Sequence, residues 1–296
     1  MSLIKNEAIL SAVQEQLQKN NITEADILSI TELNLSRKNL TDVSDLERFT
    51  NLVNLDIVEN CLTDLSPLAG LKNLRRLAAG NDPFLSEEDR SKRKGINHFA
   101  DYSFLKHLTG LIDIDFTATG DDNIEYVKYL PNVEEFRAYS NPITDISPLL
   151  ACKKLHQSYF YDCPITDISV YRRLPDTFGL AVNCTGVSDL TPLAGKTKFS
   201  YLDAHDAEIE DISTLADFAS MRYVTLARNK IRDFSPLRGK TVGWLTLSGN
   251  PAEEAHLLDV LGSVRVTQAL EIVGYHFTEA EKHFLEEKQP FCQITF

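Results

Sequence analysis

Four side chains that could support nucleophilic or metal-binding chemistry recur along the chain at a nearly constant spacing. Asp162, Cys184 and Asp206 are each 22 residues apart, and His205 directly precedes the last of them. A cysteine beside a histidine could act as a nucleophile with its base, and Cys, His and Asp are also zinc ligands. However, no glycine-rich helix start or oxyanion donor lies near them, and the metal-site spacings C-x-x-C and H-E-x-x-H are absent. We therefore expect chance neighbours on a polar face, with no enzyme activity, no cofactor and no metal, and keep a Cys/His hydrolase as an alternative.

Acidic residues form a second group at related places of the chain. Asp113, Asp115 and Glu135 lie on adjoining copies of the same unit, and Asp56 and Glu59 precede them. A calcium loop of the D-x-[DN]-x-[DN]-G type is absent. We expect a solvated acidic face that selects a basic partner, chiefly through association rate.

Aromatic residues form the third group. Tyr201, Tyr223 and Trp244, which is the only tryptophan, are spaced by 22 and 21 residues. Exposed Tyr and Trp are enriched at binding hot spots, although Tyr also simply favours strands. The expected binding residues are Tyr139, Tyr159, Tyr161, Tyr201, Asp203, His205, Asp206, Tyr223, Arg228, Trp244, Asp113 and Asp115.

All three groups hold fixed places in one repeated unit. The phrase Thr-Asp-Leu-Ser-Pro-Leu at residues 63–68 returns at 144–149 and, in weaker form, at 166–169. An apolar pair recurs with it about ten times: Leu33/Leu35, Leu55/Ile57, Leu77/Ala79, Ile114/Phe116, Phe136/Ala138, Ser158/Phe160, Leu180/Val182, Leu202/Ala204, Val224/Leu226 and Leu245/Leu247. A 22-residue period with an L-x-x-L-x-L-x-x-N-x-L frame is the signature of a leucine-rich-repeat solenoid. We expect an α/β fold with a curved, parallel concave sheet and short 3₁₀ or α turns on the convex side.

Strand alternation assigns a direction to each position when Ile30 is counted as position one. Positions four and six point into the core, so positions three, five and seven should face solvent on the concave sheet. These outward positions include Gln157, Gly179 and all the aromatic residues above. The following Asp-x-Ser-Pro-Leu segment should form a turn that Ser caps and in which Pro is the first helical residue.

Three domains or segments are expected. Residues 1–29 form a helical cap, with one helix at 5–19 and a second one after Thr23, and residues 30–252 hold the repeats. Residues 253–296 form a mixed C-terminal cap, with helices near 251–261 and 278–288 and strands near 265–273 and 291–296.

An insertion interrupts the third copy. Leu74 and Leu111 are 37 residues apart, one period plus 15, and the excess lies near residues 85–100. Ser86 starts a helix-like pattern that Gly95 ends. The insertion is interpreted either as a tolerated surface loop or as part of a binding face.

The segment Leu52 to Asn73 resembles the 22-residue repeat of the internalin-like leucine-rich-repeat family of bacteria, and the likeness covers residues 30–252, about three quarters of the chain. The resemblance implies a platform that binds another protein, and relatives that act as surface or secreted adhesins on host receptors. It also implies a ladder of Asn side chains at position nine, which bond the backbone of adjacent turns. Asn60, Asn141, Asn229 and Asn250 keep that position, whereas it is replaced in the other copies by Lys38, Asp82, Thr119, Cys163, Thr185 and Ala207.

Composition limits the function classes. The net charge of −13 and the pI near 5 disfavour nucleic acid and anionic membranes, and the first thirty residues hold no apolar segment long enough to span one. Five scattered cysteines fit a reducing compartment. We expect a protein-binding module with no small-molecule substrate, namely a cytoplasmic bacterial adaptor, inhibitor or immunity-type protein. The alternative is an internalin-like surface or secreted adhesin, if an export signal has been removed.

Overall fold

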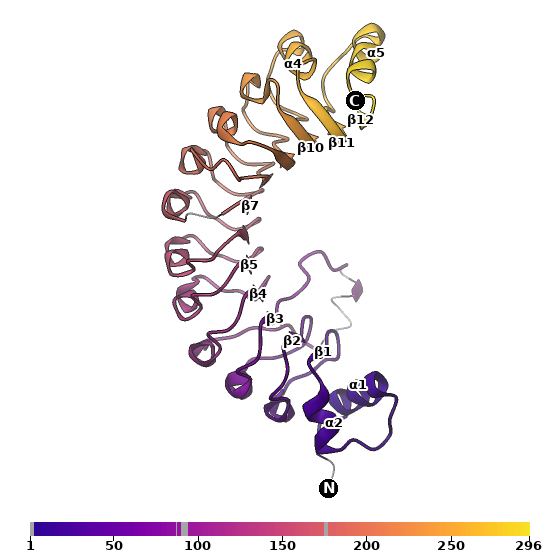
Figure 1. Cartoon of the computed structure of the whole chain (residues 1–296), viewed down its shortest axis with the longest axis vertical. Coiled ribbons are helices and arrows are strands. Elements are labelled where there is room, and N and C mark those ends of the chain that lie inside the picture. Colours follow the sequence, from indigo (N-terminus) through magenta and orange to yellow (C-terminus); the bar gives the residue numbers. More distant parts are fainter. Residues whose placement is uncertain (1–2, 87, 90–93, 175–176) are drawn as a thin grey trace. The chain divides into compact units, whose positions relative to one another are not determined.

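We describe a computed structural model of the chain, which covers residues 3–86, 88–89, 94–174 and 177–296. The chain divides into two compact units, residues 1–143 with 148–155 and residues 144–147 with 156–296, and each is described by itself. Both units are built from the same turn, in which a short strand is followed by a 3₁₀ helix (Figure 1).

Parallel strands form the sheet in each unit, and their order follows the chain. The first unit contains β1 Glu32–Asn34, β2 Asn54–Asp56, β3 Arg76–Ala78, β4 Asp113–Asp115 and β5 Glu135–Arg137. The second contains β6 Gln157–Tyr159, β7 Gly179–Ala181, β8 Tyr201–Asp203, β9 Met221–Thr225, β10 Thr241–Thr246, β11 Arg265–Glu271 and β12 Gln293–Thr295. The register pairs equivalent positions of successive copies, such as Leu33 with Leu55 and Leu202 with Val224. The leucine-rich-repeat solenoid predicted from the period is therefore confirmed.

Short 3₁₀ helices follow the strands. They are η1 Ser44–Arg48, η2 Ser66–Gly70, η3 Ser103–His107, η4 Glu125–Tyr129, η5 Ser147–Ala151, η6 Ser169–Arg173, η7 Thr191–Leu193, η8 Ser213–Asp217 and η9 Ser235–Leu237. The predicted capping by Ser is wrong in detail, because Ser66 is itself the first residue of η2 and donates its backbone N–H to Asp64 at 2.7 Å. The short side chain two residues earlier thus fixes the turn, as Asp145 and Asp233 do for their own copies.

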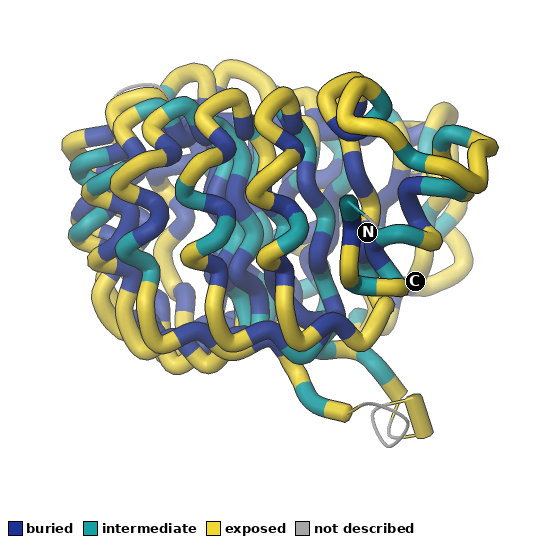
Figure 2. The backbone as a smooth tube through the Cα atoms, turned by 90° about the horizontal axis from the view of Figure 1, so that it is seen from below, coloured by how far each residue is buried: buried dark blue, intermediate teal, exposed yellow. Residues whose placement is uncertain are grey.

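The core lies between the strands and the 3₁₀ helices. Figure 2 shows buried residues recurring in every turn, and positions four and six, such as Leu55 and Ile57, are buried throughout. Ser158 is the polar exception among them. The hydroxyl of the fully buried Tyr171 in η6 bonds the Ser158 Oγ, so this core position keeps a hydrogen-bond partner.

Asparagine side chains join successive turns, as the resemblance implied. Asn229 is representative, because its Nδ2 donates to the carbonyls of Ala204 and Leu226 and its Oδ1 accepts the N–H of Ile209. In two copies that lack Asn, the hydroxyls of Thr119 and Thr185 donate to the carbonyl three residues earlier. The residue before the ladder position adopts a left-handed conformation in most copies, for example Asp206 with φ 53°.

The inserted copy contradicts one assignment of ladder residues. Asn97, which is fully buried, donates to the carbonyls of Ile57 and Ala79 at 2.9 Å and accepts the N–H of Leu62 at 3.0 Å. Asp82 is therefore not the ladder residue of this copy, and the 15 extra residues are 82–96 rather than a segment near 85–100. The misplacement came from counting forward from Leu74, whereas counting back from Leu111 leads to Asn97.

The helix expected within the insertion is described only in part. Ser86 Oγ accepts the N–H of Asp89 at 3.1 Å, and Glu88 and Asp89 are helical. Residues 87 and 90–93 lie outside the described residues. Phe84 and Ile96 are among the exposed large apolar side chains.

Helices flank the repeats at both ends. At the N-terminal end, α1 Glu7–Leu17 begins after Asn6, whose side chain accepts two backbone N–H groups, and α2 Glu24–Ser29 begins with a capping box at Thr23. At the C-terminal end, α4 Glu254–Leu261 precedes β11, and α5 Glu279–Lys288, with a capping box at Thr278, precedes β12. None of the helices in the described residues has the length and apolarity needed to cross a membrane.

Candidate functional site

A row of aromatic side chains lies on the outer face of the sheet in the second unit. Tyr201 pairs with Tyr223 and Tyr223 pairs with Trp244 in the register of β8, β9 and β10. Strand alternation directs all three away from the core, which places equivalent side chains next to each other. Tyr159 of β6 extends the row. We call these four residues the aromatic surface.

The rings of the aromatic surface contact one another in sequence. The ring centroids of Tyr201 and Tyr223 are 4.9 Å apart at an interplanar angle of 11°, and those of Tyr223 and Trp244 are 6.2 Å apart. Tyr159 meets Tyr201 edge to face at 6.0 Å. All four side chains are half-buried, because each ring covers part of its neighbour. Mutual packing holds the rings in place, so a partner would lose little side-chain entropy on binding them.

Polar atoms remain available along this row. Burial, followed by the charge of Asp203, raises the pKa of Tyr201, and burial raises the pKa of Tyr223, so both phenols are neutral donors at neutral pH. The Trp244 indole N–H donates to Thr246 Oγ1 at 3.2 Å. The surface therefore offers flat apolar area together with hydroxyl groups.

Two outward positions differ from the expectation. Gln157 and Gly179 are buried, and a Cβ on Gly179 would lie 2.8 Å from Gln157 Cγ. The Gln157 side chain therefore covers the glycine, so these two residues add no aromatic area. Tyr161 in the second unit and Tyr139 in the first are half-buried after their strands, and neither ring belongs to the contacts of the aromatic surface.

The acidic residues of the first unit are largely compensated by arginines, which sequence reasoning had missed. Arg137 pairs with Asp113 at 2.6 Å and also with Glu135, and Arg76 lies 3.9 Å from Asp113. Their signal was available, since both arginines occupy outward strand positions beside the acids. These residues line a groove of about 460 Å³ on the sheet face of the first unit.

The expected solvated acidic face is therefore only partly present. Burial raises the pKa of Asp115, which is half-buried beside Arg137. Glu59 is buried, and its Oε1 accepts the N–H of Asp82. The groove presents mixed charge.

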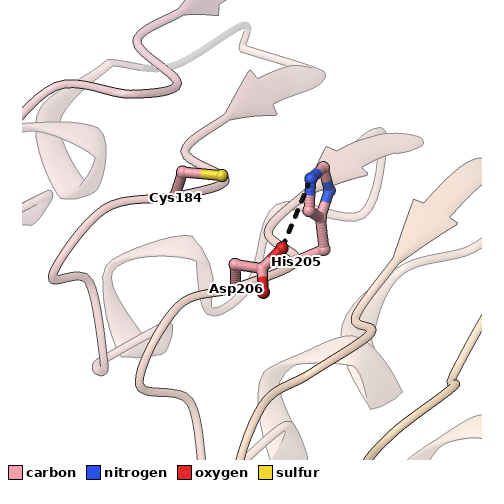
Figure 3. Close-up of side chains that lie close together, drawn as sticks. All are labelled: Cys184, His205 and Asp206. Carbon is pink, nitrogen blue, oxygen red and sulfur yellow. Dashed lines mark ion pairs between the residues drawn. The ribbon is translucent and has the colours of Figure 1, made fainter.

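The structure brings Cys184, His205 and Asp206 together in the second unit. One ligand atom from each lies within 4.8 Å of the others (Figure 3). His205 Nδ1 is 2.7 Å from Asp203 Oδ1, and its Nε2 is 3.8 Å from Asp206 Oδ2. Asp206 also binds the guanidinium of Arg228, with 2.7 Å between Asp206 Oδ1 and Arg228 Nε. Asp162 adds charge to this group, because it is among the causes of the raised Cys184 pKa.

This arrangement does not resemble an activated thiol. Burial, followed by the charges of Asp206 and Asp162, raises the pKa of Cys184, whereas a nucleophilic cysteine needs a lowered pKa. The residue is exposed rather than set in a pocket. The geometry thus supports a nucleophilic role less well than the sequence pattern did.

A buried polar cluster in the first unit was also missed. Tyr102 donates its hydroxyl to Asp121 Oδ1 at 2.6 Å and Tyr126 donates to Asp121 Oδ2 at 3.2 Å, and the two rings stack at 4.1 Å. No sequence signal pointed to it, because these residues belong to η3, η4 and the segment between them. Burial raises the pKa of Asp121 to about 6.

Replacement of Asp121 by Asn is expected to change how stability depends on pH. The raised pKa means that the folded state binds this proton more tightly than the unfolded state, whose pKa is near 3.8. The contribution is full below about pH 4 and is lost as pH rises through about 6, by on the order of 2 to 3 kcal/mol. Urea unfolding across this range should show the free-energy difference between wild type and Asp121→Asn shrinking as pH rises. The exposed neighbour provides the control, since Asp122→Asn should leave the profile unchanged, and parallel profiles for Asp121→Asn and wild type would contradict the assignment.

Comparison with solved structures identifies the fold class. An internalin, InlF, from Listeria monocytogenes superposes with a TM-score of 0.71 and 22% identity, over 99% of this chain and 96% of that chain. The chain has an internalin-like leucine-rich-repeat fold. A second internalin from Listeria monocytogenes has a TM-score of 0.55 and 26% identity over 90% of this chain and 95% of its own. A leucine-rich-repeat protein of Leptospira interrogans has a TM-score of 0.64 at 16% identity over 90% of this chain and 84% of its own, so this type of fold is not restricted to internalins.

Sequence comparisons add nothing to this internalin-like fold. No protein-family profile matches the chain. No curated protein matches it either.

Proposed function

We propose that this internalin-like chain is a non-enzymatic protein-binding module whose partner docks on the aromatic surface. The observation that supports the proposal is the continuous ring contact from Tyr159 through Tyr201 and Tyr223 to Trp244. Half-buried Tyr and Trp anchors that are already held in place are typical of binding hot spots. Asp203, His205, Asp206 and Arg228 lie beside or just after β8 and β9 and would supply the polar rim.

The role that we propose is that of a cytoplasmic adaptor, inhibitor or immunity-type protein. The acidic net charge favours a basic partner over nucleic acid, and the described residues contain no disulfide. Fractionation of the native cells with an antibody to the chain tests this location. Recovery in the culture medium or on the cell surface would instead favour the adhesin.

Alanine at Trp244 or Tyr223 is expected to weaken partner binding by about 2 kcal/mol or more, which is roughly 30-fold in Kd. Affinity capture from the native lysate is performed in parallel with wild type, Trp244→Ala, Tyr223→Ala and Phe291→Ala. The proteins retained by wild type and Phe291→Ala but lost from the first two variants are the partners. The purified partner is then titrated, with Trp244 fluorescence as a direct reporter, since it is the only tryptophan.

The control residue is chosen by exposure and location. Phe291 is 72% exposed and precedes β12, away from the aromatic surface. Tyr171 would be a poor control, because it is fully buried and its removal would damage the fold. A partner that binds Trp244→Ala and Tyr223→Ala as tightly as wild type would overturn the proposal, and the insertion at residues 82–96 would be the next surface to test.

A further inference from the structure

The strongest unassigned feature is the group formed by Cys184, His205 and Asp206 in the second unit. The sequence pattern gave no reason to expect a metal, because the three residues match none of the familiar ligand spacings. The solenoid replaces sequence spacing with spatial spacing, since residues 22 apart occupy equivalent places in adjacent turns. Three different ligand types thereby converge (Figure 3).

We propose that Cys184 Sγ, His205 Nε2 and an Asp206 carboxylate oxygen bind a divalent zinc-type cation, with a fourth position open to water or to a partner's side chain. The distances are close to those required. Two light-atom ligands about 2.1 Å from a tetrahedral ion lie about 3.4 Å apart. His205 Nε2 and Asp206 Oδ2 are 3.8 Å apart, and all three ligand atoms lie within 4.8 Å, so side-chain rotation alone can close the site.

The residue behind His205 supports the same assignment. Asp203 Oδ1 lies 2.7 Å from His205 Nδ1, which fixes the proton on Nδ1 and leaves the Nε2 lone pair directed at the cluster. Metal-binding histidines are usually held in this way by a carboxylate. Asp203 is itself anchored by the hydroxyl of Thr225 on the next strand, so the support is rigid.

A buried polar atom beside the site also lacks a partner. Asn183 is 7% exposed, its Nδ2 lies 3.4 Å from His205 Nε2, and its Oδ1 has no hydrogen-bond partner among the described residues. Buried acceptors without a donor are uncommon in native structures. A metal-bound water would supply the donor that this oxygen lacks.

The charge of the surroundings fits a cation. Asp162, Asp203 and Asp206 all disfavour the Cys184 thiolate, whereas Arg228 is the one cation named among the influences on that thiol. A divalent ion would offset this excess of negative charge and bind the thiolate directly. Asp206 can keep its ion pair with Arg228 while it binds the metal, because a carboxylate offers several acceptor positions.

Cobalt substitution provides the test. Co²⁺ titrated into the reduced full-length chain should bind with a stoichiometry of one and show thiolate-to-metal charge-transfer absorption, which Zn²⁺ then displaces. Cys184→Ser should abolish this absorption, and His205→Ala should weaken Zn²⁺ binding by more than about 100-fold. Asp203→Asn should retain the absorption but weaken binding by about 10- to 100-fold, as expected for a positioning residue.

A matched cysteine excludes trivial thiol binding. Cys292 is half-buried in the C-terminal cap, and Cys292→Ser should bind cobalt as wild type does. Circular dichroism of each variant confirms that the solenoid is intact, which is expected because Cys184 is exposed and His205 half-buried. No charge-transfer absorption at saturating cobalt, its loss in Cys292→Ser, or unchanged zinc affinity in His205→Ala would each overturn the proposal.

Discussion

Asn97→Ala is expected to lower the free energy of unfolding by about 2 to 5 kcal/mol, because it removes partners from buried backbone groups. The variant leaves the N–H of Leu62 and the carbonyl of Ala79 without the Asn97 side chain. The carbonyl of Ile57 is less affected, since Asn60 Nδ2 also donates to it at 2.8 Å. Urea unfolding followed by circular dichroism measures the loss.

Asp82→Ala is the matched control, because Asp82 occupies the ladder position when the repeat is counted forward. Its carboxylate accepts the N–H of Phe84 and lies 3.4 Å from the exposed Arg37 guanidinium. Such surface contacts are worth less than about 1 kcal/mol. Equal losses for the two variants would mean that the insertion does not span residues 82–96.

Deletion of residues 1–29 is expected to convert the chain from a soluble monomer into an aggregating species. The N-terminal cap buries Ile9, Val13 and Ile27 completely, and its removal exposes the apolar side of the first turn together with the free edge of β1. Uncapped repeat ends and open sheet edges promote association. Size-exclusion chromatography with light scattering gives the measurement.

Point variants separate this effect from a general consequence of truncation. Val13→Asp places a charge in the cap interface and should cost about 3 kcal/mol or more. Ser11→Asp puts the same charge on the exposed side of α1 and should be close to neutral. A deletion variant that stays monomeric and unfolds cooperatively would show that the cap is dispensable.

The sequence by itself determined the repeat fold. A 22-residue period constrains every copy to the same strand and turn, so Leu202 and Val224 pair as the pattern predicted. The period also predicted the row of Tyr201, Tyr223 and Trp244, because strand alternation gives side chains their direction without reference to the rest of the molecule. The capping boxes at Thr23 and Thr278 are equally local, since each depends on residues three positions apart.

Only the tertiary structure decided which side chains contact one another. Asp113 is expected to be a free acid from its neighbours in sequence, but Arg137 on the next strand pairs with it, because strand spacing brings the two within reach. The ladder role of Asn97 depends on where the extra residues leave the turn, which a sequence count from one end cannot locate. Cys184, His205 and Asp206 converge for the same reason, since the stacking of adjacent turns sets their separation and no local pattern encodes it.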